Sequence, residues 1–119
     1  MQKTSSKKHT IDAEGVVFGR LASRIAVLLM GKERVGYRPY EDRGGSVEVI
    51  NAAKIKFTGR KLDEKVYYHH TMHPGGLKTK TMKTWFEKDP SAVLKYAVAK
   101  MLPKNKLRNN FLKRLTILP

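Results

Sequence analysis

A helix-forming stretch between two strand-forming stretches is the feature that most constrains the fold of this chain. Residues 9–13 and 46–50 each favour a short strand, and the segment between them predicts a helix from Arg20 that Gly31 can end. A connection of this length suits a right-handed crossover between two parallel strands. The pattern therefore predicts an α/β fold. The apolar residues of the helix recur at helical spacing and comprise Leu21, Ile25, Leu28 and Leu29.

The rest of the chain continues the alternation of strands and helices. Residues 66–71 favour a strand, and residues 54–58 fit either a strand or the start of a helical turn. Asp89 and Pro90 predict a helix start, Pro103 ends that helix, and Asn105 can cap another. Residues 115–118 are apolar and suit a final strand. The helix from Pro90 is expected to bury Val93, Leu94, Ala97, Val98 and Met101.

Length and composition limit the architecture further. A chain of 119 residues can bury one core, so we expect a flexible basic arm over residues 1–8 and a single domain over residues 9–119. The absence of cysteine excludes disulfides, thiolate metal sites and thiol catalysis. The longest apolar run, around residues 25–30, is too short to span a membrane. We expect neither membrane association nor a homo-oligomer.

The charge indicates the class of partner. The chain has 25 Lys and Arg against 10 Asp and Glu, which gives a formal net charge of +15. Such self-repulsion disfavours a compact state unless a polyanion neutralises it, so nucleic acid is the leading partner. A merely soluble basic protein is the alternative. No acidic residue follows Asp89, so the C-terminal quarter should present a strongly positive surface.

Residues 67–78 concentrate aromatic rings, imidazoles, glycines and lysine more densely than any other stretch. A metal site is disfavoured because His69 and His70, adjacent on a strand, point to opposite faces, and His73 lies next to Pro74, outside any helix. Acid–base catalysis lacks paired carboxylates and an orienting partner. We therefore predict no catalytic residue, no metal and no cofactor.

Nucleic-acid binding accounts for more of the sequence. Lys and Arg can contact phosphates, paired glycines allow close approach of a backbone, and tyrosine and histidine can stack on bases or bond to 2′-hydroxyls. Only one of Tyr67 and Tyr68 should be free for RNA, Leu77 should pack inside, and Arg108 should face outward. The predicted RNA-binding residues are Arg20, Arg24, Lys32, Lys56, Arg60, Lys61, Tyr68, His69, His70, His73, Gly75, Gly76, Lys78, Lys100, Lys104, Lys106 and Arg108.

Four segments carry a resemblance to a known family. They are Val17–Ser23, Val49–Ile55 with Thr58-Gly59, Lys65–Thr71 with Gly75-Gly76, and Met101–Asn105. In order and spacing they resemble large-subunit ribosomal protein thirteen of bacterial type. Two features depart from that family: Gly45 stands where many members have Asp, and the chain stops at Pro119 where bacterial members commonly continue with a polar tail.

The resemblance implies a fold and a function. The implied fold is a three-layer α/β/α domain around a small, mainly parallel four-stranded sheet. The implied function is structural: binding of large-subunit ribosomal RNA beside neighbouring ribosomal proteins, early in subunit assembly. It also implies no catalysis, and a place in the large subunit of cytoplasmic or organellar ribosomes. Two hypotheses of other classes are a small metal-dependent nuclease using His69, His70 and His73, and an assembly or regulatory factor that binds RNA transiently.

Overall fold

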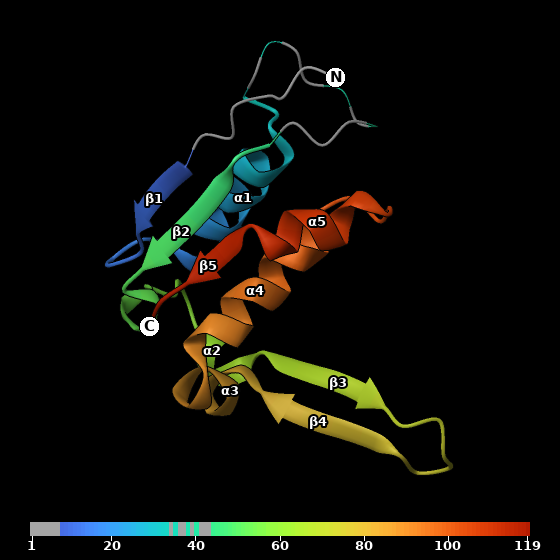
Figure 1. Cartoon of the computed structure of the whole chain (residues 1–119). Helices are drawn as coiled ribbons and strands as arrows, with labels where there is room; N and C mark the ends of the chain where they lie inside the picture. Colours follow the sequence, from blue (N-terminus) through green and yellow to red (C-terminus); the bar gives the residue numbers. More distant parts are fainter. Residues whose placement is uncertain (1–7, 34, 36–37, 39, 41–43) are drawn as a thin grey trace.

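The structure is a computed structural model that describes residues 8–33, 35, 38, 40 and 44–119. Figure 1 shows an α/β body with a β-hairpin that extends away from it. The basic arm expected at residues 1–8 lies outside the described residues except for Lys8, which begins the first strand. Most of the glycine-containing loop before residue 44 lies outside them as well.

The central sheet is parallel and has three strands, in the order β1 (Lys8–Asp12), β2 (Ser46–Ile50) and β5 (Leu115–Ile117). Val49 lies opposite Ile11 on one side and Ile117 on the other. The connection from β1 to β2 contains helix α1 (Phe18–Met30). The predicted strand–helix–strand unit is therefore confirmed, with the helix beginning two residues before Arg20.

Helix α1 forms the centre of the core. Leu21, Ile25 and Leu29 are fully buried, because their spacing places them on one face of the helix. The helix ends at Gly31, whose φ of 80° lies in the left-handed region and whose N–H donates to the Val27 carbonyl at 3.0 Å. Glycine adopts this conformation without a steric penalty, which is why it ends the helix here.

Helix α4 (Pro90–Met101) packs against α1. It begins where the sequence predicts, since the Asp89 side chain accepts a hydrogen bond from the Ala92 N–H at 3.2 Å. Val93, Leu94 and Val98 are buried as expected, and Ala97 is partly buried. Met101 is 43% exposed, so its expected burial is wrong. It lies in the last turn of α4, at the exposed edge of the contact with α1, where its sulfur accepts a hydrogen bond from the Ser23 hydroxyl at 3.5 Å.

Helix α5 (Leu107–Lys113) inserts Phe111 into the same core. The N-cap is Lys106 rather than the expected Asn105, although the carboxamide of Asn105 accepts a hydrogen bond from the Leu107 N–H at 3.1 Å and so supports the start of the helix from one residue earlier. Strand β5 follows directly. Helices α1, α4 and α5 therefore lie where the sequence predicted helices, and each contributes buried residues to the core.

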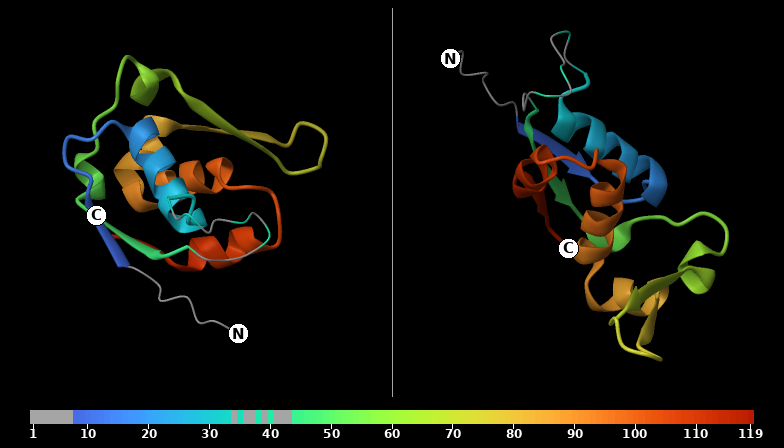
Figure 2. Two further views of the ribbon diagram at one scale, coloured as in Figure 1. Left: turned by 90° about the horizontal axis from the view of Figure 1, so that it is seen from above. Right: turned by 90° about the vertical axis from the view of Figure 1, so that its right-hand side faces the viewer.

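Figure 2 shows α1 and α4 on one side of the sheet and α5 beside β5. One detail of the expected architecture is corrected, because the parallel sheet has three strands rather than four. The expected fourth parallel strand is reduced to a single bridge between Val17 and Lys56.

The reason for the missing strand lies in the turn before the bridge. Asn51 has a left-handed backbone (φ 58°) and starts the 3-10 helix η1 (Ala52–Lys54). Both expectations for this stretch are met in part: the helical turn ends at Lys54, since two alanines favour helical over extended backbone, and the chain from Ile55 is extended up to its bridge at Lys56. Only one residue pair remains in register for parallel pairing.

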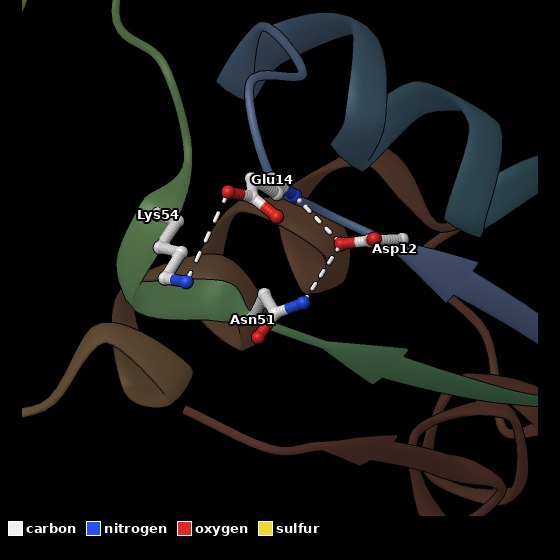
Figure 3. Close-up of polar contacts among 4 residues, drawn as sticks. All are labelled: Asp12, Glu14, Asn51 and Lys54. Carbon is white, nitrogen blue, oxygen red and sulfur yellow. Dashed lines mark hydrogen bonds and ion pairs between the residues drawn. The ribbon is translucent and has the colours of Figure 1, made fainter.

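A polar network ties the ends of β1 and β2 together (Figure 3). The carboxylate of Asp12 accepts hydrogen bonds from the Asn51 side-chain amide and from the Glu14 N–H, each at 3.0 Å. The Asn51 bond, then the Glu14 N–H, lowers the pKa of Asp12, because both stabilise the charged carboxylate. Lys54 lies 3.8 Å from Glu14 beside the network.

The projecting hairpin consists of β3 (Val66–His70) and the antiparallel β4 (Leu77–Thr81). Short helices flank it, α2 (Lys61–Glu64) before and α3 (Met82–Lys88) after. The predicted strand over 66–71 is confirmed, whereas β4 and α3 were not predicted. Aromatic contacts fix α3 to the body: Phe57 stacks on Phe18 at 5.1 Å and meets the edge of Phe86 at 5.0 Å between centroids.

Candidate nucleic-acid interface

The alternation of side chains along the hairpin determines which groups face the body. In β3, Tyr67 and His69 lie on one face, and their partners across the hairpin are Lys80 and Lys78. Tyr67 turns towards the body, with its ring centroid 5.0 Å from Trp85 and 5.4 Å from Tyr96. Tyr68 points the other way and is 68% exposed. One tyrosine is therefore held by packing and the other is free, as expected.

Three rings from separate elements meet on the body side of the hairpin. Tyr67, Trp85 and Tyr96 come from β3, α3 and α4, and all three pairs of rings meet at steep angles, edge towards face. We call them the aromatic cluster. Burial, and secondarily the charge of Tyr96, raises the pKa of Tyr67 above the ordinary tyrosine value.

Lysine side chains lie over the rings of the aromatic cluster. The Lys80 ammonium stands 4.6 Å from the Trp85 centroid, Lys100 stands 5.3 Å from Tyr96, and Lys65 stands 5.5 Å from Tyr67. Between the hairpin and the rings lies a cavity of about 420 Å³. The arrangement joins apolar ring surface to positive charge, a combination suited to the bases and phosphates of a nucleic acid.

The tip of the hairpin is a tight turn. The Gly76 N–H donates to the His73 carbonyl at 2.9 Å, and Gly75 has a φ of 73°, the features of a type II turn with Pro74 at its second position. A side chain at Gly76 would collide with Thr71. Gly75 therefore provides the positive φ of the turn, and Gly76 provides space for Thr71. The predicted break at Pro74-Gly75-Gly76 is therefore the turn of the hairpin.

The histidines of this region are not gathered around one point. His69 and His70 lie on opposite faces of β3, and the His70 Nδ1 accepts the Met72 N–H at 2.9 Å, which supports the positive φ of Met72. Among the residues that the structure describes, no group of three or more His, Asp or Glu is placed to hold a metal ion. The His70 side chain therefore bonds to the backbone of the hairpin tip.

Leu77 is not packed inside, contrary to expectation. It lies opposite His70 on the outer face of the hairpin and is 56% exposed. The hairpin extends beyond the body, so no second layer covers that face (Figure 1). The outer face thus exposes Tyr68 and Leu77 together with polar groups.

Several other predicted RNA-binding residues lie near the base of the hairpin. Arg20 and Arg24 are exposed on α1, and the start of that helix borders a hollow that Lys65 and Lys100 also line. Arg60 is exposed beside a second, open hollow and lies 4.0 Å from Glu64. Lys56 is exposed at the Val17 bridge, and Lys61 begins α2, with its side chain outside the described part.

The remaining candidates lie elsewhere. Lys32 follows the opposite end of α1 from Arg20, and Lys104 and Lys106 are exposed in the segment before α5. Arg108 does not simply face outward: its guanidinium donates to the carbonyls of Leu102 and Pro103, each at 3.3 Å. These carbonyls follow the end of α4, where backbone acceptors lack helical partners. The prediction of an outward Arg108 is therefore corrected to a partly buried residue that also supports the chain.

Four residues of this surface were not predicted from the sequence: Lys65, Lys80, Trp85 and Tyr96. A signal was present, because Met82, Trp85 and Phe86 have the i, i+3, i+4 spacing of an amphipathic helix. Thr81 caps that helix by accepting the Thr84 N–H at 3.4 Å. Strand β4 gives a weaker signal, since all its residues are exposed and it has no buried face to produce apolar alternation.

Known proteins match nearly the whole chain. The family model described as Ribosomal protein L13 matches residues 6–119. The large ribosomal subunit protein uL13 of Maridesulfovibrio salexigens is 50% identical over 107 residues, 90% of this chain and 75% of that protein. Those of Thermotoga maritima and Aquifex aeolicus are each 47% identical over 116 residues, 98% of this chain and 78% and 81% of theirs. No helix in the described ranges is long and apolar enough to cross a membrane.

Proposed function

The chain belongs to the ribosomal protein L13 family, and from this membership we propose that it is a structural constituent of the large ribosomal subunit that binds large-subunit ribosomal RNA. The observation that carries the RNA-binding part is the hairpin, which extends away from the body (Figure 1). Lysine, histidine and tyrosine side chains of the hairpin are exposed. Ribosomal RNA is a folded polyanion, so a projecting cationic element can reach between its helices.

The contacts are proposed to be mainly to phosphates and sugars. Lys78 and Lys80 on β4, with Lys65 and Arg60 at the base of the hairpin, supply cations, while Gly75 and Gly76 leave the turn free of side chains. Phosphate contacts release counterions and supply most of the sequence-independent affinity. Exposed histidine and tyrosine side chains can add hydrogen bonds to 2′-hydroxyls.

The site of action is the large subunit of a ribosome in the cytoplasm, with an organellar ribosome as the alternative. Binding early in subunit assembly is part of the proposal. A chain with a net charge of +15 gains the most electrostatic free energy by binding RNA before other basic proteins have neutralised the RNA phosphates. The neighbouring large-subunit proteins are its proposed protein partners.

Sedimentation tests the place of the protein in the cell. We expect the native chain to co-sediment with the large-subunit peak in a sucrose gradient, at one copy per particle. A protein that stays at the top of the gradient would contradict the proposal, and substoichiometric binding to precursor particles alone would favour a transient assembly factor. Elemental analysis of the purified protein separates the nuclease hypothesis: stoichiometric metal that is lost in His70→Ala would support an enzyme.

Matched charge variants test the role of the hairpin. K78Q/K80Q and K8Q/K54Q each remove two positive charges, the first from the hairpin and the second from side chains paired with Glu48 and Glu14. If the hairpin grips RNA, the first pair should weaken binding to large-subunit RNA more than the second in a filter-binding assay. Equal losses would mean that only net charge matters.

A further inference from the structure

The cavity between the hairpin and the aromatic cluster has the properties of a site for a single base. We propose that it receives one unstacked nucleobase from a single-stranded segment of the RNA. The proposal rests on the RNA-binding function above and adds a definite ligand class to one part of its surface. The cavity, about 420 Å³, falls within the range of roughly 300–1,000 Å³ typical of small-molecule sites.

The walls are suited to a flat aromatic ligand. Tyr67 and His69 line the cavity from β3, while Trp85 and Tyr96 line it from α3 and α4. These rings meet one another at steep angles and so do not stack face to face. Ring faces left unstacked are the surfaces on which unpaired bases stack in single-strand-binding proteins.

The lysines of the cavity can yield to a base. Lys80 stands over the Trp85 ring, and such a cation–π contact is weak at an exposed site. Stacking of a base on an aromatic side chain is the stronger interaction. A base can therefore replace the ammonium group over Trp85, and Lys80 then remains at the rim to contact the phosphate of the same nucleotide.

Charge selects a nucleotide over other flat ligands. Lys78 and Lys80 line the cavity and Lys100 stands over Tyr96, while none of the residues that line it is acidic. An aromatic side chain of a protein partner would satisfy the rings but would leave these ammonium groups without an anion. Bases inside a duplex are stacked and cannot enter, so the ligand must come from a loop, a bulge or a single strand.

Trp85 makes the proposal directly measurable, since it is the single tryptophan of the chain and lines the cavity. The probes are octaadenylate and an octamer with the same phosphates whose bases are replaced by abasic sites. Fluorescence anisotropy of end-labelled octamer measures binding, and Trp85 emission reports stacking. We expect octaadenylate to quench Trp85 and to bind roughly tenfold more tightly than the abasic octamer.

Two variants of the facing ring serve as a matched pair. Tyr96→Leu removes the ring and should weaken octaadenylate binding roughly tenfold, with little effect on the abasic octamer. Tyr96→Phe keeps the ring and should bind like the parent chain. Circular dichroism checks that both are folded. If Tyr96→Leu does not fold, the comparison of the two octamers on the parent chain still tests whether the cavity binds a base.

The outcomes separate this proposal from the one on which it rests. Binding of both octamers with equal affinity and unchanged Trp85 emission would overturn the base site and leave the RNA-binding function intact. Failure to bind either octamer or large-subunit RNA would overturn both. Quenching by octaadenylate alone, lost in Tyr96→Leu and kept in Tyr96→Phe, would support the base site.

Discussion

Asp12 is the residue whose environment the structure defines most closely. Its carboxylate holds the loop after β1 to Asn51 after β2, and these hydrogen bonds lower its pKa. A carboxyl group with a lowered folded-state pKa adds stability above its unfolded pKa, and this stability is lost as the pH falls through the folded value. The network should therefore make the fold sensitive to acid.

We expect Asp12→Asn to flatten the acid dependence of stability. Between neutral pH and the ordinary carboxyl pKa of about 4 the parent chain keeps its stability, and below that value it should lose stability faster than the variant. Urea unfolding at a series of pH values measures this. Glu87→Gln, which changes an exposed carboxylate elsewhere, serves as the control. Identical pH profiles for the parent and Asp12→Asn would show that the network contributes nothing.

Single residues were predicted correctly where local geometry decides their conformation. Gly31, Asp89 and the Pro74-Gly75-Gly76 turn do what the sequence indicated, because a left-handed φ, a helix cap and a fixed proline φ are properties of a few adjacent residues. The predictions were wrong for Met101, Leu77 and Arg108, since the exposure of these side chains depends on which other elements lie beside them.

Strand β3 places its two tyrosines in different surroundings. Tyr67 belongs to the aromatic cluster, so Tyr67→Ala should lower the free energy of unfolding by about 1–3 kcal/mol, less than for a fully buried ring. Tyr68→Ala should change stability by less than about 0.5 kcal/mol, because the side chain is exposed. Thermal and urea unfolding measure both changes.

The same pair should differ in the opposite sense towards RNA. If Tyr68 stacks on a base or bonds to a sugar, Tyr68→Ala weakens binding of large-subunit RNA while the protein stays fully folded. Tyr67→Phe, which keeps the ring, is the matched control and should retain both stability and affinity. A destabilised Tyr68→Ala would instead mean that this tyrosine packs against the body.

The long helices with a buried face were predicted, whereas the short helix α3 and the exposed strand β4 were missed. Helices α1 and α4 have apolar stripes that face the core, which gives a clear period in the sequence. Strand β4 is exposed along its whole length, so no such period exists, although the turn before it and the length of β3 are consistent with a hairpin. Its position is set by pairing with β3.

The whole molecule distributes its charge unevenly. Asp12, Glu14 and Glu48 lie on the strands of the parallel sheet or next to them, whereas the chain after Asp89 contains no acidic residue. The hairpin adds exposed lysines at the opposite end of the molecule from β1 (Figure 1). The hairpin itself, residues 66–81, contains no acidic residue, although Asp63, Glu64 and Glu87 lie in the short helices that flank it.

This distribution predicts a steep dependence of RNA affinity on salt. Each phosphate contact should contribute about −0.7 to −0.9 to the slope of log K against log salt concentration. Filter binding of large-subunit RNA at several potassium chloride concentrations measures the slope. In K78Q/K80Q it should become shallower by up to about 2 units. A slope near zero in the parent chain would contradict an interface dominated by phosphates.

The sequence by itself determined the α/β class, the parallel strand–helix–strand unit, the helix caps, the turn of the hairpin and the resemblance to the family. All of these depend on residues close together along the chain or on its total charge. Tertiary structure decided the number of strands, the projection of the hairpin, and which tyrosine is free. It alone brings Tyr67, Trp85 and Tyr96 together from three elements, because packing between distant segments is set by the shapes of whole surfaces and leaves no local period in the sequence.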